Sequence, residues 1–427
     1  MADERIALIG FGLSNRAVYE FLKGYGFRFI VRSKDETLVP DGVECITGES
    51  YLSTEESVVF RSPSCLPRCI KGNGKILSEA SLALYLSPCK KIGVTGSDGK
   101  TTVSTLIDLF LKKGGTSSYL GGNNGYPLIN HVGKLKSSDT LVCELSSFQL
   151  IDTVADFDTA VITGVTENHL DIHKDMDEYL EAKANILKSC KRAVINIDNG
   201  YAEYFLKKSA SCQRRVLATL DPQKAHGGEF SYVYPKDGYV CFDGEVLFPV
   251  NCIRLKGDFN ILNVCMAVGA VYPKVSKEHI ENALYEFCGV PSRMELVAVK
   301  NGIFFYDSSI DSTPARTVAT LSAFQGDKTI VLLGGYDKNL TYDTLKKGLL
   351  GIKRALICGA NSEKIYKSLE GVCKIQLCAD LEESIKKAYE IASCGDNIVL
   401  SPASASFDAF QNYVKKSEKF KETVRGL

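Results

Sequence analysis

The sequence lacks several features that would assign it to a specialised class of protein. It has no run of about eighteen apolar residues, so no membrane-spanning helix is expected. Its formal net charge is +0, from 51 basic and 51 acidic residues. No excess positive charge can therefore replace phosphate counterions, and we expect no nucleic-acid partner. The start, MADERIALIGFG, has no long apolar segment, so we expect no secretory signal peptide.

Cysteine is present, but a pairing pattern is not. The 15 cysteines are an odd number and include no C-x-x-C pair. We therefore expect reduced thiols in a cytoplasmic protein rather than a disulfide framework. The apolar content of 45% and the charged content of 24% are typical of a globular protein. A chain of 427 residues exceeds one hydrophobic core, so two or three domains are expected.

Short apolar runs alternate with helical patterns along the whole chain. Parallel strands separated by helices give this rhythm. The runs lie at 5–12, 27–31, 57–63, 90–96, 140–147, 159–165, 192–198, 303–307, 329–335, 354–360, 373–379 and 396–402. Between about 228 and 255, strand patterns alternate around the turn sequences KDG and FDG, which predict an antiparallel flap.

We therefore predict an α/β protein with three domains. The first, at 1–90, is Rossmann-like. The second, at 91–290, is P-loop ATPase-like and carries the flap. The third, at 291–427, is again Rossmann-like.

The segment IGVTGSDGKTT resembles a phosphate-binding loop between a strand and a helix. It departs from the G-x-x-x-x-G-K-[ST] pattern, because Val94 stands at the first glycine position and the glycine falls at Gly96. Backbone N–H groups around Gly96 and Gly99 could surround a triphosphate at the helix start. Lys100 would then neutralise phosphate oxygens, and the Thr101 hydroxyl would reach Mg²⁺. A tight turn with an exposed lysine is the alternative.

Three further residues are candidates for metal chemistry. Glu144 ends an apolar run, where a carboxylate can hold Mg²⁺. His169 follows another strand, and a neutral imidazole can bind a divalent ion. Lys183 falls on the apolar stripe of a helix, where its amine is neutralised, paired or extended to solvent. A neutral amine would add CO₂ to give an anionic carbamate. Each has an ordinary alternative: a strand-end acid, a loop histidine, a snorkelling lysine.

The N-terminal turn IGFGLSNRA resembles a dinucleotide fingerprint, but Asn15 occupies the third glycine position. Arg32 lies where an enzyme that uses NAD would have an acid, so NAD is disfavoured. Gly12, Ser14 and Asn15 could instead donate hydrogen bonds to a different nucleotide. Arg32 and Lys34 could approach a diphosphate.

Small hydroxyl residues follow a strand in the third block, in SPASASFDAF, and LLGGYDKN supplies Lys338 at a comparable position. Hydroxyls and a lysine suit a small substrate that carries a carboxylate. A helix cap and a surface charge are the alternative.

The order of these motifs is more informative than any one of them. GVTGSDGKTT, ELSSFQL, VTENHLD, EYLEAKANIL, KGDFNILN, SRMELV, YDSSIDS, LGGYDK and SPASASFDAF follow one another as in the Mur ligases, and the resemblance runs from residue 5 to about 424. The glycine at Gly96 is similar to that of the family's own T-G-x-x-G-K-[ST] loop. The resemblance implies a cytoplasmic, monomeric, ATP-dependent ligase. ELSSFQL indicates the branch that adds D-glutamate to UDP-N-acetylmuramoyl-L-alanine in peptidoglycan synthesis.

The resemblance also implies roles for individual residues. Those expected to act in catalysis are Lys100, Glu144, His169 and Lys183. Two Mg²⁺ sites would involve Thr101, Glu144, His169 and Lys183, the last carbamylated. ATP would contact Gly96, Ser97, Asp98, Gly99, Lys100, Thr101, Thr102, Asn260, Asn263, Arg293 and Asp307. The two other substrates would contact Gly12, Ser14, Asn15, Ser33, Lys34, Asn123, Ser146, Lys338, Ser406 and Tyr413.

The chain departs from the family pattern at several positions. YDSSIDS has Ser309 and Asp311 where a lysine and a threonine are usual, and Phe259 replaces a histidine. Asn168 replaces an aspartate, and Arg32 lies where a uridine-contacting aspartate is familiar. Three alternatives stay open: a ligase for another amino acid, a folylpolyglutamate-type ligase, and a non-catalytic nucleotide-binding regulator.

Overall fold

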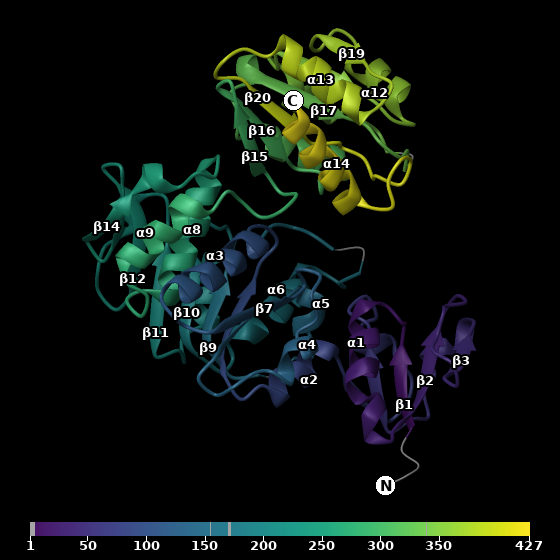
Figure 1. Ribbon diagram of the computed structural model, residues 1–427. Helices are drawn as coiled ribbons and strands as arrows, with labels where there is room; N and C mark the ends of the chain where they lie inside the picture. Colours follow the sequence, from purple (N-terminus) through teal and green to yellow (C-terminus); the bar gives the residue numbers. More distant parts are fainter. Residues whose placement is uncertain (1–4, 154, 170–171, 339) are drawn as a thin grey trace. The chain divides into compact units, whose positions relative to one another are not determined.

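The computed structural model describes residues 5–153, 155–169, 172–338 and 340–427, and it has an α/β fold with three mostly parallel sheets (Figure 1). The contacts divide the chain into two compact units. The first contains Met1–Asn251 and Leu262–Ala283, and the second contains Cys252–Ile261 and Leu284–Leu427. The boundary predicted near residue 90 lies within the first unit and stays a prediction. In the described part of the chain, no helix is both long and apolar enough to cross a membrane.

The first sheet of the first unit has five parallel strands in the order β3-β2-β1-β4-β5. The three apolar runs predicted as strands before residue 90 are β1, β2 and β4. The two edge strands are short and only partly buried, which explains why their sequence signal is weak. The strands are β1 Arg5–Ile9, β2 Arg28–Ser33, β3 Glu44–Thr47, β4 Val58–Arg61 and β5 Lys75–Leu77, with helices α1 Leu13–Leu22 and α2 Glu79–Leu86.

The second sheet of this unit has nine strands in the order β14-β13-β12-β11-β10-β9-β6-β8-β7. The strands are β6 Lys90–Thr95, β7 Ser118–Gly122, β8 Thr140–Glu144, β9 Phe157–Ile162, β10 Cys190–Asn196, β11 Arg214–Ala218, β12 Ser231–Lys236, β13 Tyr239–Phe242 and β14 Glu245–Pro249. The antiparallel pairing predicted between 228 and 255 is confirmed for β12, β13 and β14. These strands extend the central sheet, because β12 also pairs in parallel with β11.

Seven helices accompany the central sheet, and two of them, α8 and α9, cross the boundary between the units. The helices are α3 Lys100–Lys113, α4 Ile129–Val132, α5 Ser147–Leu150, α6 Met176–Ala184, α7 Ala202–Lys208, α8 Asp258–Val271 and α9 Lys277–Glu286. Short 3-10 helices in the described chain cover Lys23–Tyr25, Glu49–Leu52, Pro67–Cys69, Asn185–Leu187, Pro222–Lys224, Val250–Cys252 and Gly326–Lys328.

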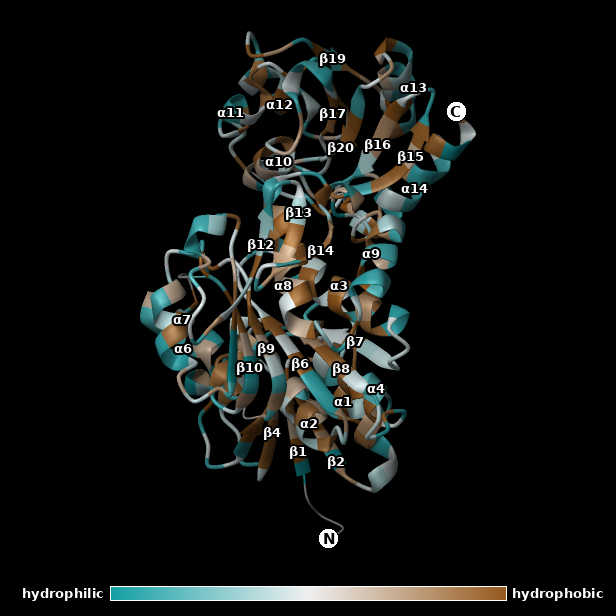
Figure 2. Ribbon diagram, turned by 90° about the vertical axis from the view of Figure 1, so that its left-hand side faces the viewer, coloured by the Kyte–Doolittle hydropathy of each residue, from teal (hydrophilic) through white to brown (hydrophobic). Residues whose placement is uncertain are grey.

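The second unit contains a six-stranded sheet in the order β15-β16-β20-β17-β18-β19, with only the β15–β16 pair antiparallel. Alternate residues of β17 point to opposite faces. Ile330 and Leu332 therefore join one hydrophobic cluster, and Val331 and Leu333 join another. Figure 2 colours the central strands of this sheet largely as hydrophobic, in agreement with the burial of their residues. The elements are β15 Glu295–Lys300, β16 Ile303–Asp307, α10 Pro314–Leu321, β17 Thr329–Leu333, α11 Leu345–Leu349, β18 Arg354–Ile357, α12 Ser362–Leu369, β19 Ile375–Leu377, α13 Leu381–Ile391, β20 Asn397–Leu400 and α14 Tyr413–Gly426.

A fully buried arginine joins the five-stranded sheet to the segment after β8. Arg61, the last residue of β4, forms a two-pronged ion pair with Asp152, with nitrogen–oxygen distances of 2.6 and 2.5 Å. The same guanidinium donates to the carbonyl oxygens of Phe148, at 2.6 Å, and Cys65, at 3.1 Å. A buried guanidinium is tolerated only when its donors are satisfied. Arg61 therefore fixes the segment that contains ELSSFQL.

A buried carboxyl group lies at the start of α2. Glu79 accepts a hydrogen bond of 2.8 Å from the backbone N–H of Ile129, the first residue of α4. Burial raises the pKa of Glu79 to about 7, and this effect outweighs the hydrogen bonds from Ile129 and Leu128, which lower it. The folded chain thus retains a proton that the unfolded chain releases near its ordinary pKa of about 4.3.

We predict that this carboxyl group makes the unfolding free energy fall as the pH rises from about 4.5 to about 7, because the folded state holds more protons there. The loss should reach about 3 kcal/mol and then level off. Glu79→Gln keeps an oxygen that accepts from Ile129 but cannot ionise. Urea unfolding of both proteins between pH 5 and 8 should show the variant gaining relative stability over this range. A difference that stays constant with pH would contradict the assignment.

Candidate active site

Three neighbouring strands, β6, β8 and β9, bring their carboxyl ends to one edge of the central sheet. The chain leaves β6 at Thr95, turns through residues 96–99, and enters α3 at Lys100. The predicted strand, loop and helix are therefore confirmed. The first N–H groups of a helix lack partners within that helix, so the start of α3 is suited to an anion.

Two glycines in this loop have positive φ angles and close neighbours. Gly96 has φ +153°, and an added Cβ would overlap Thr163 Oγ1 on the loop after β9. Gly99 has φ +80°, and an added Cβ would overlap the side-chain oxygen of Asn263 on α8. Both glycines are thus required by the backbone angle and by the space available.

Two lysines converge on the carbonyl oxygen of Gly96. Lys100 Nζ donates to it at 3.0 Å and to the carbonyl oxygen of Ser97 at 2.9 Å. Lys183, which reaches it from α6, donates at 2.7 Å. Lys100 was predicted from the glycine-rich loop and Lys183 from the apolar stripe of a helix. Their side chains therefore meet at one oxygen atom.

Lys183 has little access to water, since only 1% of the residue is exposed. Burial lowers its pKa well below the ordinary range, and the positive charge of Lys100 lowers it further, whereas Asp98 acts in the opposite direction. Its Nζ lies 4.5 Å from the centre of the Tyr179 ring. A lysine in these surroundings has an increased fraction of neutral, nucleophilic amine.

Tyr179 also connects α6 to the glycine loop at residues 96–99, a contact that the sequence analysis did not identify. Its hydroxyl lies 2.8 Å from Ser97 Oγ, which in turn lies 3.0 Å from both the carbonyl oxygen and the amide nitrogen of Thr166. A second hydrogen bond fixes the loop at residues 96–99: Thr163 Oγ1 donates to the carbonyl oxygen of Asp98 at 2.5 Å. Only the helical spacing of Tyr179 and Lys183 could have suggested a shared role.

Glu144 is the last residue of β8, and only 1% of its surface is exposed. One carboxylate oxygen accepts from Asn123 Nδ2 at 3.0 Å, and the other, Oε2, has no hydrogen-bond partner. A buried carboxylate oxygen without a partner is unfavourable unless a cation or donor completes it. This oxygen fits the predicted role of Glu144 toward Mg²⁺, and Asn123 lies directly beside it.

His169 adopts φ +57° in the loop after β9 and is exposed, and its ring packs edge-on to Phe148 with a centroid distance of 4.9 Å. The described chain contains no group of three His, Cys, Asp or Glu residues that could hold a metal ion. Magnesium commonly takes one or two carboxylates and completes its shell with water and phosphate oxygens. The Glu144 carboxylate and the Thr101 hydroxyl offer oxygen donors of this kind, whereas His169 offers a nitrogen, so its predicted role toward Mg²⁺ stays a prediction.

His173, which the sequence analysis missed, links the ends of α5 and α6. Its Nδ1 donates to Glu178 at 3.2 Å, and its Nε2 accepts from Ser147 Oγ at 3.0 Å. Burial lowers its pKa, which Glu178 partly offsets, so this neutral tautomer is favoured. The ring stacks on Phe148 at 5.0 Å. Ser146, predicted as a substrate contact, uses its hydroxyl in the capping box of α5.

Some of the residues predicted to contact the substrate near the N-terminus are buried and bonded within the protein, and the others are accessible to solvent. Asn15 is buried, and its amide donates to the carbonyl oxygens of Ile9, Gly10 and Phe60 at 2.8–3.2 Å. Arg32 is buried in an ion pair of 2.8 Å with Glu56. Both side chains therefore stabilise the sheet. The more accessible predicted residues here are Gly12, Ser14, Ser33 and Lys34.

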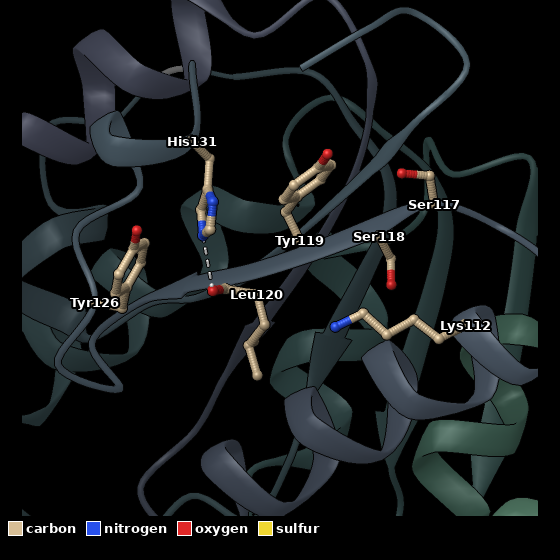
Figure 3. Close-up of a pocket in the computed structure, with 7 residues that line it drawn as sticks. All are labelled: Lys112, Ser117, Ser118, Tyr119, Leu120, Tyr126 and His131. Carbon is tan, nitrogen blue, oxygen red and sulfur yellow. Dashed lines mark hydrogen bonds between the residues drawn. The ribbon is translucent and has the colours of Figure 1, made fainter. Parts of the chain in front are cut away.

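Among the cavities of the described residues, two are lined by residues other than those of the glycine loop at 96–99. One, of about 330 Å³, adjoins the N-terminal turn and is lined by Phe11, Arg16, Tyr19, Glu20, Leu38, Val39 and Pro40. The other, of about 620 Å³, lies beside β7 and is shown in Figure 3; its lining contains none of the predicted site residues. There, His131 Nε2 donates to the carbonyl oxygen of Leu120 at 3.0 Å, and burial lowers the pKa of His131. The first cavity adjoins the predicted substrate contacts.

The second unit carries the remaining predicted residues. Asn260, on α8, donates to the carbonyl oxygen of Lys256 at 2.7 Å. Asp307 ends β16, and its carboxylate accepts from Ser417 and from the backbone N–H of Ser309. Burial raises the pKa of Asp307 despite these hydrogen bonds. The Nε atom of Arg293 is buried without a hydrogen-bond partner.

The residues predicted to hold the amino-acid substrate follow the ends of β17 and β20. Lys338 and Tyr413 are exposed, whereas Ser406 is buried and its Oγ has no hydrogen-bond partner. The loop after β17 is fixed by Lys416, which is buried and donates to the carbonyl oxygen of Gly334 at 2.7 Å. Asn361 accepts from the N–H of Gly335 at 2.8 Å. These two anchoring residues were not predicted.

Asp311 is one of the departures from the family pattern, and its carboxylate has hydrogen-bond partners within the second unit. Its Oδ2 accepts from the hydroxyls of Thr320 and Ser401, each at 2.7 Å. The carboxylate is buried and joins α10 to the end of β20. The structure therefore gives Asp311 a structural role.

We predict that Gly96→Ala destabilises the protein more than a matched substitution of another glycine that has a positive φ angle. Gly115 has φ +75° but open space around its Cβ position. Gly115→Ala should therefore cost only backbone strain, about 1 kcal/mol, while Gly96→Ala adds overlap with Thr163 and should cost about 3 kcal/mol. Denaturant unfolding of the two variants measures this difference. Equal losses would show that the space around Gly96 is not restrictive.

Comparison with known proteins places this geometry in a family. Residues 94–271 match the Mur ligase middle domain, and residues 292–404 match the Mur ligase, glutamate ligase domain. A protein of Clostridium tetani named UDP-N-acetylmuramoylalanine–D-glutamate ligase is 36% identical, with 100% of this chain and 97% of the relative covered. A protein of the same name from Acetivibrio thermocellus is 35% identical over the same shares.

Solved structures share the fold at lower identity. The UDP-N-acetylmuramate-alanine ligase MurC of Thermotoga maritima has a TM-score of 0.61 and 16% identity, and the alignment covers 99% of both chains. A pseudomurein peptide ligase type C of Methanothermus fervidus has a TM-score of 0.55 and 17% identity, with 99% of this chain and 100% of that one covered. The full-length identity to curated relatives and the two matched domains show that this chain belongs to the Mur ligase family.

Proposed function

We propose that this chain is an ATP-dependent ligase that adds D-glutamate to UDP-N-acetylmuramoyl-L-alanine, a step of peptidoglycan synthesis and hence of cell-wall growth, cell shape and division. The relatives that match over the full length carry the name of this activity. The observation that carries the chemistry is the convergence of Lys100 and Lys183 on the carbonyl oxygen of Gly96. It places two amines, one of them poorly solvated, at the loop that would hold the ATP phosphates.

The proposal assigns one task to each of three domains. Residues 1–90 would be Rossmann-like and bind the UDP-linked substrate, with the 330 Å³ cavity beside Gly12 as the place for the uridine end. Phe11 and Tyr19 offer aromatic surface there, and Arg16 offers positive charge. Residues 91–290 would be P-loop ATPase-like and bind ATP. Residues 291–427 would be Rossmann-like and bind D-glutamate.

At the phosphate loop, backbone N–H groups from residues 96–102 would surround the triphosphate of ATP. Lys100 would exchange its two carbonyl acceptors for phosphate oxygens and so stabilise the charge of the transferring group. The side chains of Asn260 and Asn263 would contact the adenine, while Arg293 and Asp307 would complete the nucleotide site.

Magnesium would supply charge neutralisation between phosphate oxygens, at two sites held by Thr101, Glu144, His169 and a carbamylated Lys183. The unpartnered Glu144 Oε2 supports the carboxylate's part. The lowered pKa of Lys183 supports the carbamate, since a neutral amine nitrogen attacks the carbon of CO₂ and then loses a proton. The product would carry a negative charge where the neutral amine carried none.

The reaction would proceed in two steps. The carboxylate of the muramoyl-L-alanine substrate attacks the γ-phosphorus of ATP, which gives an acyl phosphate and ADP. The D-glutamate amine then attacks the acyl carbon, and a tetrahedral intermediate releases phosphate as the amide forms. Asn123 and Ser146 would contact the acyl substrate, and Lys338, Ser406 and Tyr413 would hold D-glutamate.

The remaining expectations belong to the same proposal. We expect a monomer in the cytoplasm, where ATP and nucleotide-linked precursors are available, with no nucleic-acid partner.

The direct test is phosphate production with ATP, magnesium, UDP-N-acetylmuramoyl-L-alanine and D-glutamate, omitting each in turn. We predict that every omission abolishes it and that L-alanine, L-lysine and L-glutamate do not replace D-glutamate. Preference for another amino acid would identify a different ligase. Nucleotide binding without phosphate release under any of these conditions would identify a regulator.

Lys100→Met should lower kcat/KM by about 100-fold or more, because an apolar side chain cannot stabilise the transferring phosphoryl group. Lys112→Met is a matched control on the same helix, since Lys112 pairs with Asp108 in a partly exposed ion pair. It should keep nearly full activity. Equal activity of the two variants would contradict the role of Lys100.

A further inference from the structure

We propose that Cys190 and Cys212 form an oxidisable thiol pair that a peroxide converts into a reversible disulfide. Their sulfur atoms lie 2.9 Å apart, although the residues are 22 positions apart in the sequence. A formed disulfide has an S–S distance of about 2.05 Å, so bond formation requires a movement of less than about 1 Å. Both thiols are free in this structure. This inference does not depend on the proposed function.

The two thiols are chemically different. Cys190 is the first residue of β10, and either of the two sulfur atoms could donate in their hydrogen bond; the contact raises the pKa of Cys190 and lowers that of Cys212. Burial opposes the effect at Cys212, and the positive charge of Arg215 assists it. We therefore take Cys212 as the thiol that ionises first, and a thiolate is the reactive form.

The surroundings allow a small oxidant to reach Cys212. The residue is only 8% exposed, but it lies between α7 and β11 with exposed neighbours, Ser211 and Gln213, on either side. Cys190 is 7% exposed and belongs to the same hydrophobic cluster. Hydrogen peroxide is small enough for this access, and the lowered pKa of Cys212 favours it as the first site of attack, with Cys190 as the resolving thiol.

The reaction balances with one peroxide. The Cys212 thiolate attacks one oxygen of hydrogen peroxide, the O–O bond breaks, and the leaving hydroxide takes a proton to become water. The Cys190 sulfur then attacks the sulfenic sulfur of Cys212, the S–O bond breaks, and the second oxygen leaves as water with the Cys190 proton. Two thiols are thus oxidised by two electrons, and one peroxide is reduced to two waters.

The bond would close a loop that contains α7 and fix the segment that follows α6. Cys212 Sγ already lies 3.9 Å from the carbonyl oxygen of Leu187, which ends the 3-10 helix directly after α6. Oxidation would therefore restrict the end of the segment that carries Lys183. A cross-link that restricts the unfolded chain also stabilises the fold.

The test treats the full-length protein with hydrogen peroxide, blocks the remaining thiols with N-ethylmaleimide, and identifies cross-linked peptides by mass spectrometry. We expect a peptide pair joining Cys190 to Cys212, with the loss of two hydrogens, and its disappearance after dithiothreitol. The exposed Cys69 and Cys394 serve as internal controls for unselective oxidation. Cross-links to these residues in equal yield, or no Cys190–Cys212 pair when Cys69 is oxidised, would overturn the proposal.

Two serine variants separate the roles. In Cys190→Ser, the reaction should stop at a sulfenic acid on Cys212, which dimedone traps. In Cys212→Ser, neither product should form at this site. The melting temperature provides a second readout: peroxide should raise Tm by several degrees in the parent protein and leave it unchanged in both variants. A Tm that rises equally in the variants, or dimedone labelling of Cys190 instead, would contradict the assignment.

Discussion

The hydrogen bond between the Lys183 amine and the Gly96 carbonyl oxygen is the contact on which the rest of the candidate site depends. It joins α6 to the loop between β6 and α3 across 87 positions of sequence. A buried, unpaired ammonium group is strongly unfavourable, so the surroundings must either neutralise Lys183 or supply it with a negative partner. The hydrogen bond to Gly96 and the Tyr179 ring are the contacts that this amine makes. The proposed chemistry at the loop would use this amine.

The scaffold around this contact is rigid for identifiable reasons. Gly96 and Gly99 hold backbone angles that other residues rarely adopt, and Thr163, Ser97 and Tyr179 bond the loop to its neighbours. Asp175 caps α6 by accepting from the N–H of Glu178, which fixes the register of the helix. A preorganised loop stabilises a transferring phosphoryl group without reorganising during the reaction.

Much of this arrangement could be predicted from the sequence because the signals are local. The run from β6 through the glycine turn into α3 is contiguous, and the helical spacing of Tyr179 and Lys183 places the lysine on a buried stripe. The orphaned oxygen of Glu144 agrees with its strand-end position. The order of the motifs indicated the family, which the full-length relatives confirm.

The contacts that the sequence did not reveal are long-range or depend on competing partners. Arg61 meets Asp152, and Ser147 meets His173, only after folding. The strands β7 and β11 were missed because their apolar patterns are short. The amide of Asn15 could donate hydrogen bonds to a ligand, but in the structure it donates to backbone carbonyl oxygens instead. A side chain's type indicates what it can bind, whereas the fold decides which partner reaches it.

The most direct measurement of the central claim is ¹³C NMR of the protein equilibrated with ¹³C-bicarbonate. If Lys183 is a neutral amine at the phosphate loop, it should form a carbamate whose resonance is present in the parent protein and absent in Lys183→Met. No resonance beyond that of Lys183→Met would contradict the account, because the lysine would then remain an ordinary ammonium group.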